Sequence, residues 1–196
     1  METRTKWIID PFHSEIAFKV KHLMITNVRG QFKEFEASIY TIENDFMTAD
    51  IDFWINPASV DTGNADRDNH LKGPAFFDVD QFKEISFTGN TYEKVDNDGS
   101  YEMWGELTIK GITKQIKLQV EFGGVVTDPW GDEKAGFSIN GKINRKDWGL
   151  VWNAAVDGGG LLLSDEAWIS CEVELKKSKT EEVLESSAIP TTNTNN

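Results

Sequence analysis

Hydrophobic and polar residues alternate with a period of two over most of the chain, as in β-strands that bury one face. In residues 116–122, for example, every second residue is apolar and the residues between them are polar. The same alternation predicts strands in eight segments, at residues 16–20, 35–39, 51–55, 85–87, 101–109, 116–122, 137–143 and 167–175.

Turn residues between these segments favour antiparallel hairpins. Asp98-Gly99 and Lys110-Gly111 suit two-residue turns, which need positive φ, and residues 128–131 form a wider Asp-Pro-Trp-Gly reversal. Eight strands with such connections predict an all-β domain that is either a closed barrel or a sandwich. Closure also removes the exposed edges that long strands would otherwise leave.

Two stretches break the alternation. Residues 60–80 are polar and predict a short helix over Ala65, Asn69 and Leu71, which ends at Gly73-Pro74. Residues 147–164 are unusually apolar for a loop, so they are expected to pack against the rest of the protein. We expect both stretches to cover one end of the barrel.

The ends of the chain and its cysteine count bear on domains and compartment. Residues 1–176 are predicted to form the barrel domain, and residues 177–196 a polar C-terminal tail. The N-terminal residues do not resemble a signal peptide and no apolar stretch has the length of a membrane span, which predicts a cytoplasmic protein. Cys171, the single cysteine, lies in an alternating run and is expected to be a buried, inert thiol.

The formal net charge is −13 and the calculated isoelectric point is about 4.6. Such a charge repels phosphate backbones and anionic membrane surfaces, so neither a nucleic-acid partner nor stable membrane insertion is expected. The seven Trp and twelve Phe suit a sheet with a thick apolar interior. If Trp130 is exposed, a homodimer that packs around it is a further hypothesis.

Several blocks, in order along the chain, resemble the YceI-like family. They are residues 10–24 (DPFHSEIAFKVKHLM), 28–32, 67–72, 76–78, 105–114 and 143–149 (INRKDWG). The resemblance covers about residues 7–175. It implies a lipocalin-like, extended, eight-stranded antiparallel barrel, similar to polyisoprenoid-binding proteins in which a long prenyl chain lies in the core. Many members of the family resemble exported proteins with a signal peptide, and this chain departs from them at its N-terminus.

An eight-stranded barrel has room either for packed side chains or for one slim ligand. Each buried CH₂ of a ligand contributes about 0.8 kcal/mol, so even part of a prenyl chain can bind tightly. The sequence therefore predicts non-enzymatic storage or transport of an elongated isoprenoid-type lipid, a polyprenyl chain or a quinone, with no other cofactor. The expected ligand contacts are Ile16, Phe18, Val20, His22, Phe35, Ile51, Phe53, Arg67, His70, Phe87, Met103, Leu107, Leu118, Val120, Phe137, Ile139, Trp152 and Ile169.

Among the polar residues of the matching blocks, His13, Ser14, His22, Arg67 and His70 are candidates for the head group of the ligand. Arg67 in particular suits a phosphate or a quinone oxygen. For each histidine the favoured alternative is a structural role, in which a hydrogen bond holds a loop. Arg29 and Arg145 are expected to pair with the abundant carboxylates.

Three alternatives remain open. The first is a structural protein whose barrel is filled by its own side chains. The second is a hydrolase that uses Ser14 with His13 or His70 and an aspartate, although adjacent residues of a strand point to opposite faces. The third is a metal site formed by His13, His22 and His70, although the sequence contains no metal-binding motif.

Overall fold

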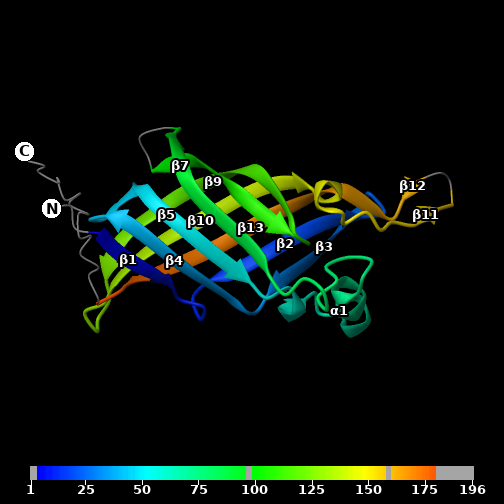
Figure 1. Ribbon diagram of the computed structural model, residues 1–196, viewed down its shortest axis with the longest axis horizontal. Coiled ribbons are helices and arrows are strands. Elements are labelled where there is room, and N and C mark those ends of the chain that lie inside the picture. Colours follow the sequence, from blue (N-terminus) through cyan, green and yellow to red (C-terminus); the bar gives the residue numbers. More distant parts are fainter. Residues whose placement is uncertain (1–3, 96–98, 158–159, 180–196) are drawn as a thin grey trace, which may run out of the picture.

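The computed structural model describes residues 4–95, 99–157 and 160–179, which form an elongated β-barrel (Figure 1). The described helices are η1 (Pro57–Ser59), α1 (Ala65–Lys72) and η2 (Arg145–Trp148). The described strands are β1 (Arg4–Ile9), β2 (Glu15–His22), β3 (Thr26–Phe32), β4 (Phe35–Ile42), β5 (Asp45–Ile55), β6 (Val60–Asp61), β7 (Ile85–Lys94), β8 (Ser100–Ile109), β9 (Ile112–Thr127), β10 (Glu133–Asn144), β11 (Ala155–Val156), β12 (Gly160–Leu161) and β13 (Leu163–Lys177).

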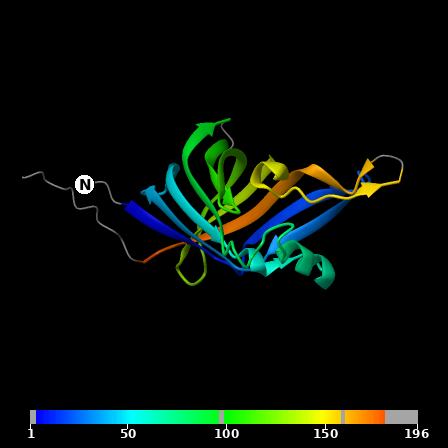
Figure 2. The same cartoon turned by 45° about the vertical axis from the view of Figure 1, so that its right-hand side comes forward.

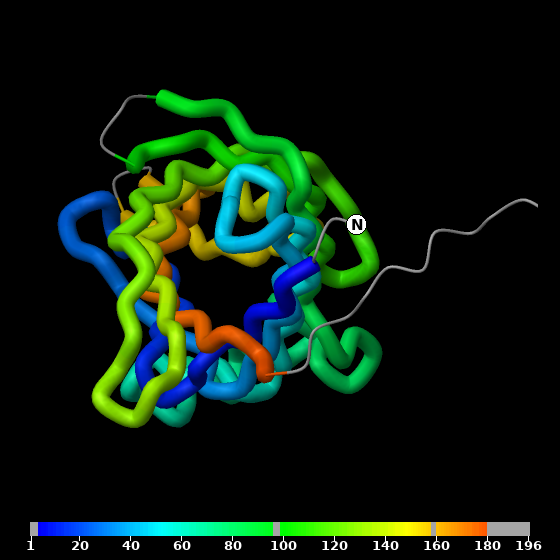
Figure 3. The backbone as a smooth tube through the Cα atoms, turned by 90° about the vertical axis from the view of Figure 1, so that its left-hand side faces the viewer, coloured from blue at the N-terminus to red at the C-terminus, as the bar shows by residue number. Residues whose placement is uncertain are grey.

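The barrel is closed, antiparallel and eight-stranded, as the sequence predicts. Three of its eight strands are interrupted, so that each consists of two labelled strands. The first is formed by β1 and β2, which both pair with β13. The second is formed by β3 and β4, which pair with β2 and β1, and the third by β5 and β6, which pair with β4 and β3. Neighbours in the barrel are also neighbours in the sequence, and the last strand pairs with the first. Viewed along the axis, the strands form a ring (Figure 3).

Each of the eight predicted segments falls in a different strand of the barrel. The alternation did not reveal β1, β3, β6, β11 and β12. In β3 the missing signal has a physical cause: Gly30 takes an inward position, where a Cβ atom would lie 2.4 Å from Cζ of Phe18. A position that must be glycine to admit a neighbouring ring looks polar in a hydrophobicity pattern.

The barrel closes through the pairing of β13 with both β1 and β2. Trp7 is fully buried, pairs with Lys177 and donates a hydrogen bond from Nε1 to Oγ1 of Thr41 at 3.1 Å. Strand β13 therefore extends one residue past the predicted end of the domain at residue 176. Residues 180–196 of the predicted tail lie outside the described residues.

An aromatic cluster fills the end of the barrel next to β1. The ring of Phe46 lies 5.0 Å from Trp7, 5.4 Å from Phe122 and 4.9 Å from Phe137, measured between centroids. Such offset and edge-on aromatic pairs bury large areas in well-defined geometry. This end of the interior is therefore closed by side chains.

The two non-alternating stretches cover the opposite end together, as expected. Helix α1 begins after Asn64, whose side chain accepts a hydrogen bond from Arg67 N, and it ends before Gly73. Figure 2 shows α1 and the β11–β12 segment at the same end of the molecule. Trp152 joins the two stretches, since its ring lies 4.6 Å from His70 and 5.5 Å from Phe76. Among the described residues, no helix is long and apolar enough to cross a membrane.

Candidate ligand-binding cavity

The barrel encloses a cavity of about 250 Å³. A single water needs only about 10–15 Å³ of such space, so the interior is hollow rather than filled by its own side chains. Apart from Arg145, Tyr101 and Cys171, every residue that lines the cavity is apolar. An apolar cavity of this kind favours a ligand without polar groups along its length.

The cavity is long. On β10 and the turn that follows it, the lining extends from Phe137 to Arg145, and on β13 it extends from Ala167 to Leu175. Eight residue steps at about 3.3 Å each correspond to roughly 26 Å along a strand. Because barrel strands are tilted, the length along the axis is somewhat shorter. The shape suits a slender chain better than a compact molecule.

Several inward-facing side chains retain exposure although the barrel is closed. Phe18, Ile51, Phe53, Ile139 and Ile169 line the cavity and are only partly buried. Side chains in a filled core leave few voids larger than a water molecule. The surface that these side chains expose to the cavity is available to a bound hydrocarbon.

Most of the predicted ligand contacts line this cavity. They come from all parts of the barrel wall, and their positions follow from the period-two alternation alone. The thirteen residues are Ile16, Phe18, Val20, Ile51, Phe53, Phe87, Met103, Leu107, Leu118, Val120, Phe137, Ile139 and Ile169.

The structure places the other five, His22, Phe35, Arg67, His70 and Trp152, outside the cavity lining. Phe35 faces inward but is buried against Phe53, at 6.4 Å between centroids. Arg67 is exposed and donates both of its side-chain hydrogen bonds to Thr62.

The remaining three lie at the covered end. His22 is the last residue of β2, where its carbonyl oxygen accepts a hydrogen bond from Ile25. His70 is exposed on α1 and stacks edge-on against Trp152. The stacked rings of His70 and Trp152 join α1 to residues 147–164, and neither of these two residues lines the cavity.

Arg145, by contrast, does line the cavity and was not among the predicted contacts. It is only 3% exposed, and it donates hydrogen bonds to the carbonyl oxygens of Ser164 at 2.8 Å, Trp152 at 2.9 Å and Leu150. The prediction that Arg145 pairs with carboxylates is therefore wrong, because the hydrogen bonds of its guanidinium go to backbone oxygens. Burial lowers the pKa of Arg145, and the nearby Asp165 opposes that shift. Arg145 ties residues 150–164 onto the barrel.

Other lining residues were missed although the same alternation contains them. Ile39, Tyr101, Ile116 and Val173 lie in predicted strands and point inward. Phe46 also lines the cavity, from the start of β5 before the predicted segment 51–55. A second group had no periodic signal, because its members lie in turns, the helix and the cover. This group comprises Leu71, Phe76, Phe77, Arg145 and Leu150.

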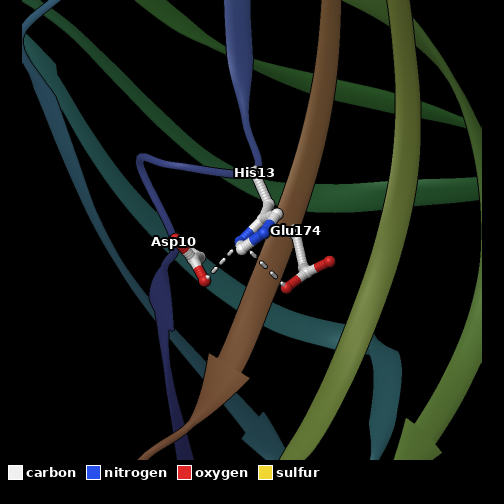
Figure 4. A group of neighbouring side chains, drawn as sticks. All are labelled: Asp10, His13 and Glu174. Carbon is white, nitrogen blue, oxygen red and sulfur yellow. Dashed lines mark hydrogen bonds and ion pairs between the residues drawn. The ribbon is translucent and has the colours of Figure 1, made fainter. Parts of the chain in front are cut away.

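Outside the cavity, Asp10, His13 and Glu174 form a cluster at the bend between β1 and β2 (Figure 4). One potential ligand atom from each lies within 4.8 Å of the others, a spacing that a metal ion can use. However, Nζ of Lys134 already donates to Asp10 at 3.0 Å and to Glu174 at 2.8 Å. The lysine ammonium pairs with both carboxylates, so the cluster is an ion-pair network that joins β1, β10 and β13.

The charges in this network have shifted pKa values. Burial raises the pKa of Asp10, but hydrogen bonds from His13, Lys134 and the amide of Phe12 outweigh it and bring the pKa to about 2. The hydrogen bond to Glu174 raises the pKa of Lys134 to about 12. Both groups are therefore charged across the neutral range.

The structure does not bring together the groups of the alternative sites. The hydroxyl of Ser14 bonds to the backbone of Glu174, as acceptor from its N–H at 3.0 Å and as donor to its carbonyl at 3.4 Å. His13 bonds to Asp10 instead, at 3.0 Å. In the described part of the chain, His13, His22 and His70 do not form a three-residue metal cluster.

Cys171 is buried, as expected, and lines the cavity. Burial raises the pKa of its thiol to about 12. Burial likewise raises the pKa of Tyr101, which also lines the cavity. Both groups are therefore neutral at physiological pH, which keeps the interior uncharged except at Arg145.

Comparison with protein-family models matches residues 7–175 to the YceI-like domain. A UPF0312 protein of Staphylococcus aureus strain N315 is 36% identical over 176 residues, which cover 89% of this chain and 99% of the relative.

Solved structures share the fold. The YceI protein of Campylobacter jejuni is 39% identical, with a TM-score of 0.68 over 81% of this chain and 90% of that one. BcnA of Burkholderia cenocepacia has a TM-score of 0.73 at 20% identity, over 85% and 98% of the two chains. A polyisoprenoid-binding domain from Saccharophagus degradans has a TM-score of 0.61 at 13% identity, over 88% and 98%.

Proposed function

Because the chain belongs to the YceI-like domain family, we propose that it binds one elongated isoprenoid-type lipid inside the barrel and catalyses no reaction. The observation that carries this proposal is the long cavity of about 250 Å³ with its nearly continuous apolar wall. A prenyl chain is slender and apolar along its whole length. Since each buried CH₂ contributes about 0.8 kcal/mol, the wall alone supplies substantial affinity.

The choice of an isoprenoid over another slim lipid is supported by the Saccharophagus degradans domain of the same fold, which is described as polyisoprenoid-binding. The absence of catalysis is inferred from the polar groups near the barrel. Arg145 binds backbone carbonyls, and Ser14 bonds to the backbone of Glu174 rather than to His13. Storage or transport of the lipid is the role that such a site fits. The cytoplasmic compartment stays a prediction from the sequence.

A cavity-filling variant tests the proposal. Ile51 lines the cavity from β5, whereas its neighbour Asp52 is exposed on the outer face. We expect Ile51→Trp to lower the affinity for a prenyl alcohol or a short-chain isoprenoid quinone at least about tenfold, because the indole takes the space of the ligand. Asp52→Trp, which adds the same ring outside, is expected to bind like the wild type. Titration calorimetry provides the affinities.

Denaturing extraction of the purified wild-type protein, followed by mass spectrometry, identifies any lipid that co-purifies. A prenyl lipid or quinone in the extract would support the proposal. A blank extract together with no uptake of added prenyl alcohols or quinones would contradict it. Equal binding by the Ile51 and Asp52 variants would place the ligand outside the barrel.

A further inference from the structure

The turn between β2 and β3 presents large apolar side chains to solvent at the covered end of the barrel. Leu23, Met24 and Ile25 are 38%, 49% and 84% exposed. The turn lies against the β12 segment, since Leu23 N donates to the carbonyl oxygen of Leu162 at 2.8 Å, and the neighbouring Leu161 is 45% exposed. We call these four residues, Leu23, Met24, Ile25 and Leu161, the apolar tip.

The backbone of this turn is strained. Leu23 and Met24 both have positive φ, of 51° and 60°, and Ile25 N donates to His22 O at 3.2 Å. This is a two-residue hairpin turn of the kind that Asn-Gly adopts most readily. The other non-glycine residues with positive φ in the described chain are Glu43, Asp78 and Lys110, all polar. A turn that holds two large apolar residues in a costly conformation, facing water, points to a use outside folding.

The hairpin that carries the tip differs in charge from the rest of the chain. Between Glu15 and Glu34 the acidic residues are absent, while Lys19, Lys21, Arg29 and Lys33 are present, in a protein with a net charge of −13. Lys33 pairs with Asp61 at 3.7 Å, whereas Lys21 and Arg29 are exposed and form no ion pair with any described residue. The net charge repels an anionic surface on average, yet this hairpin attracts one.

The tip lies close to one end of the cavity. Val20 lines the cavity from β2, and β2 ends at His22, directly before the tip. On β13, Ala167 lines the same end, opposite Val20 in the register. A water-insoluble chain that enters or leaves at this end therefore passes beside the apolar tip.

From these observations we propose that the apolar tip and the basic β2–β3 hairpin dock the protein on an anionic phospholipid membrane, with the covered end of the barrel facing the bilayer. Apolar side chains at the interface and lysines beside anionic head groups are the usual elements of peripheral membrane binding. The opposite end, which carries the β4–β5 and β9–β10 turns, faces away from the surface. Such docking gives the proposed lipid ligand a direct source.

Vesicle flotation with the full chain tests the proposal. We expect the wild type to bind vesicles of equimolar phosphatidylcholine and phosphatidylglycerol, and to bind phosphatidylcholine vesicles much more weakly. The double variant Leu23→Asn, Met24→Gly is expected to lower the partition coefficient at least about tenfold, while its thermal midpoint rises because Asn-Gly suits the turn. Opposite effects on membrane binding and on stability separate docking from a loss of folding.

Two further variants serve as controls. Lys21→Gln is expected to weaken binding to the mixed vesicles about fivefold and to leave binding to the neutral vesicles unchanged. Trp130 is 83% exposed in the turn between β9 and β10, at the opposite end, so Trp130→Asn is expected to bind vesicles like the wild type.

Equal vesicle binding by the wild type and the Leu23, Met24 double variant would overturn the proposal. So would the absence of wild-type binding together with self-association that the double variant abolishes, since the tip would then join two copies of the chain. Binding of a short prenyl alcohol in solution is measured separately on the same proteins and is expected to be unchanged. Docking without ligand binding contradicts only the proposed function, and ligand binding without docking contradicts only this inference.

Discussion

Lys134 and His13 keep Asp10 ionised at the bend between β1 and β2, and the bond to Lys134 links β1 to β10. The carboxylate is largely buried, with 17% of its side chain exposed, so its charge interacts strongly with its partners. A carboxylate whose pKa in the folded state lies below the usual value stabilises the fold only when it is ionised. Its contribution is present above the unfolded pKa and is lost as the pH falls through the folded one.

The first prediction concerns the variant Asp10→Asn. We expect the free energy of unfolding at neutral pH to fall by about 1–2 kcal/mol, since the pKa of Asp10 moves from 3.8 to about 2. The difference from the wild type should disappear as the pH falls from about 4 to about 2. Urea unfolding over this pH range measures it. Asp52→Asn, on the exposed face of β5, is the control, and a difference that does not change with pH would contradict the assignment.

Single polar residues were the least predictable part of the candidate site. Arg67 and His70 fit the expected chemistry of a head-group site, yet Arg67 donates to Thr62 and His70 packs against Trp152. Arg145 reaches the cavity because a short 3-10 turn after β10 directs it inward, which no local pattern reveals. The direction of a polar side chain in a loop depends on tertiary contacts. In a strand, by contrast, alternate side chains point inward and outward, so the direction follows from the position of the residue along the strand.

At the scale of whole elements, the alternation predicted one segment in each of the eight barrel strands and the position of α1. It failed where strands bend. Residues 10–14 interrupt the first strand, and Ile8 adds an exposed apolar residue to the short run around Trp7. In β3 the inward position of Gly30 removes a hydrophobic marker. The local sequence thus indicates that a strand is present, but the points at which a barrel strand is interrupted depend on how it packs against its neighbours.

The second prediction concerns residues 147–164, one of the two stretches that cover the end of the barrel. In Arg145→Met, three carbonyl oxygens lose their charged donor, so we expect the free energy of unfolding to fall by about 2–4 kcal/mol. Amide hydrogen exchange in residues 149–157 should accelerate more than exchange in β8 and β9. Arg67→Met is the control and is expected to cost less than about 1 kcal/mol, because its bonds stay within one loop. Uniform acceleration across the barrel would contradict a local role.

At the scale of the whole molecule, all eight strands of the barrel contribute residues to the wall of one cavity, and Cys171 is one of these residues. Its thiol is the single cysteine of the chain, so any labelling is unambiguous. With a pKa of about 12, only about one thiol in ten thousand is ionised at pH 8. We therefore expect thiol reagents to modify Cys171 slowly in the folded protein.

The third prediction is that a bound prenyl chain protects Cys171. We expect the rate of modification by a small uncharged maleimide to fall at least about fivefold when a prenyl alcohol saturates the protein, because the ligand fills the space beside the sulfur atom. Intact-mass spectrometry follows the reaction. Protein unfolded in urea should react at one rate with or without the alcohol. An unchanged rate in the folded protein would show that the ligand does not reach the middle of the barrel.

The order of strands also determines how the molecule must fold. Each strand meets the next through the intervening connection, but the first interrupted strand pairs with β13, more than 140 residues later in the sequence. Pairing between such distant segments is slow, because the chain must close a long loop first. During synthesis the apolar side chains of the interior stay exposed to solvent until the final strand has left the ribosome. We therefore expect nascent chains of this protein to be prone to aggregation until that last strand is in place.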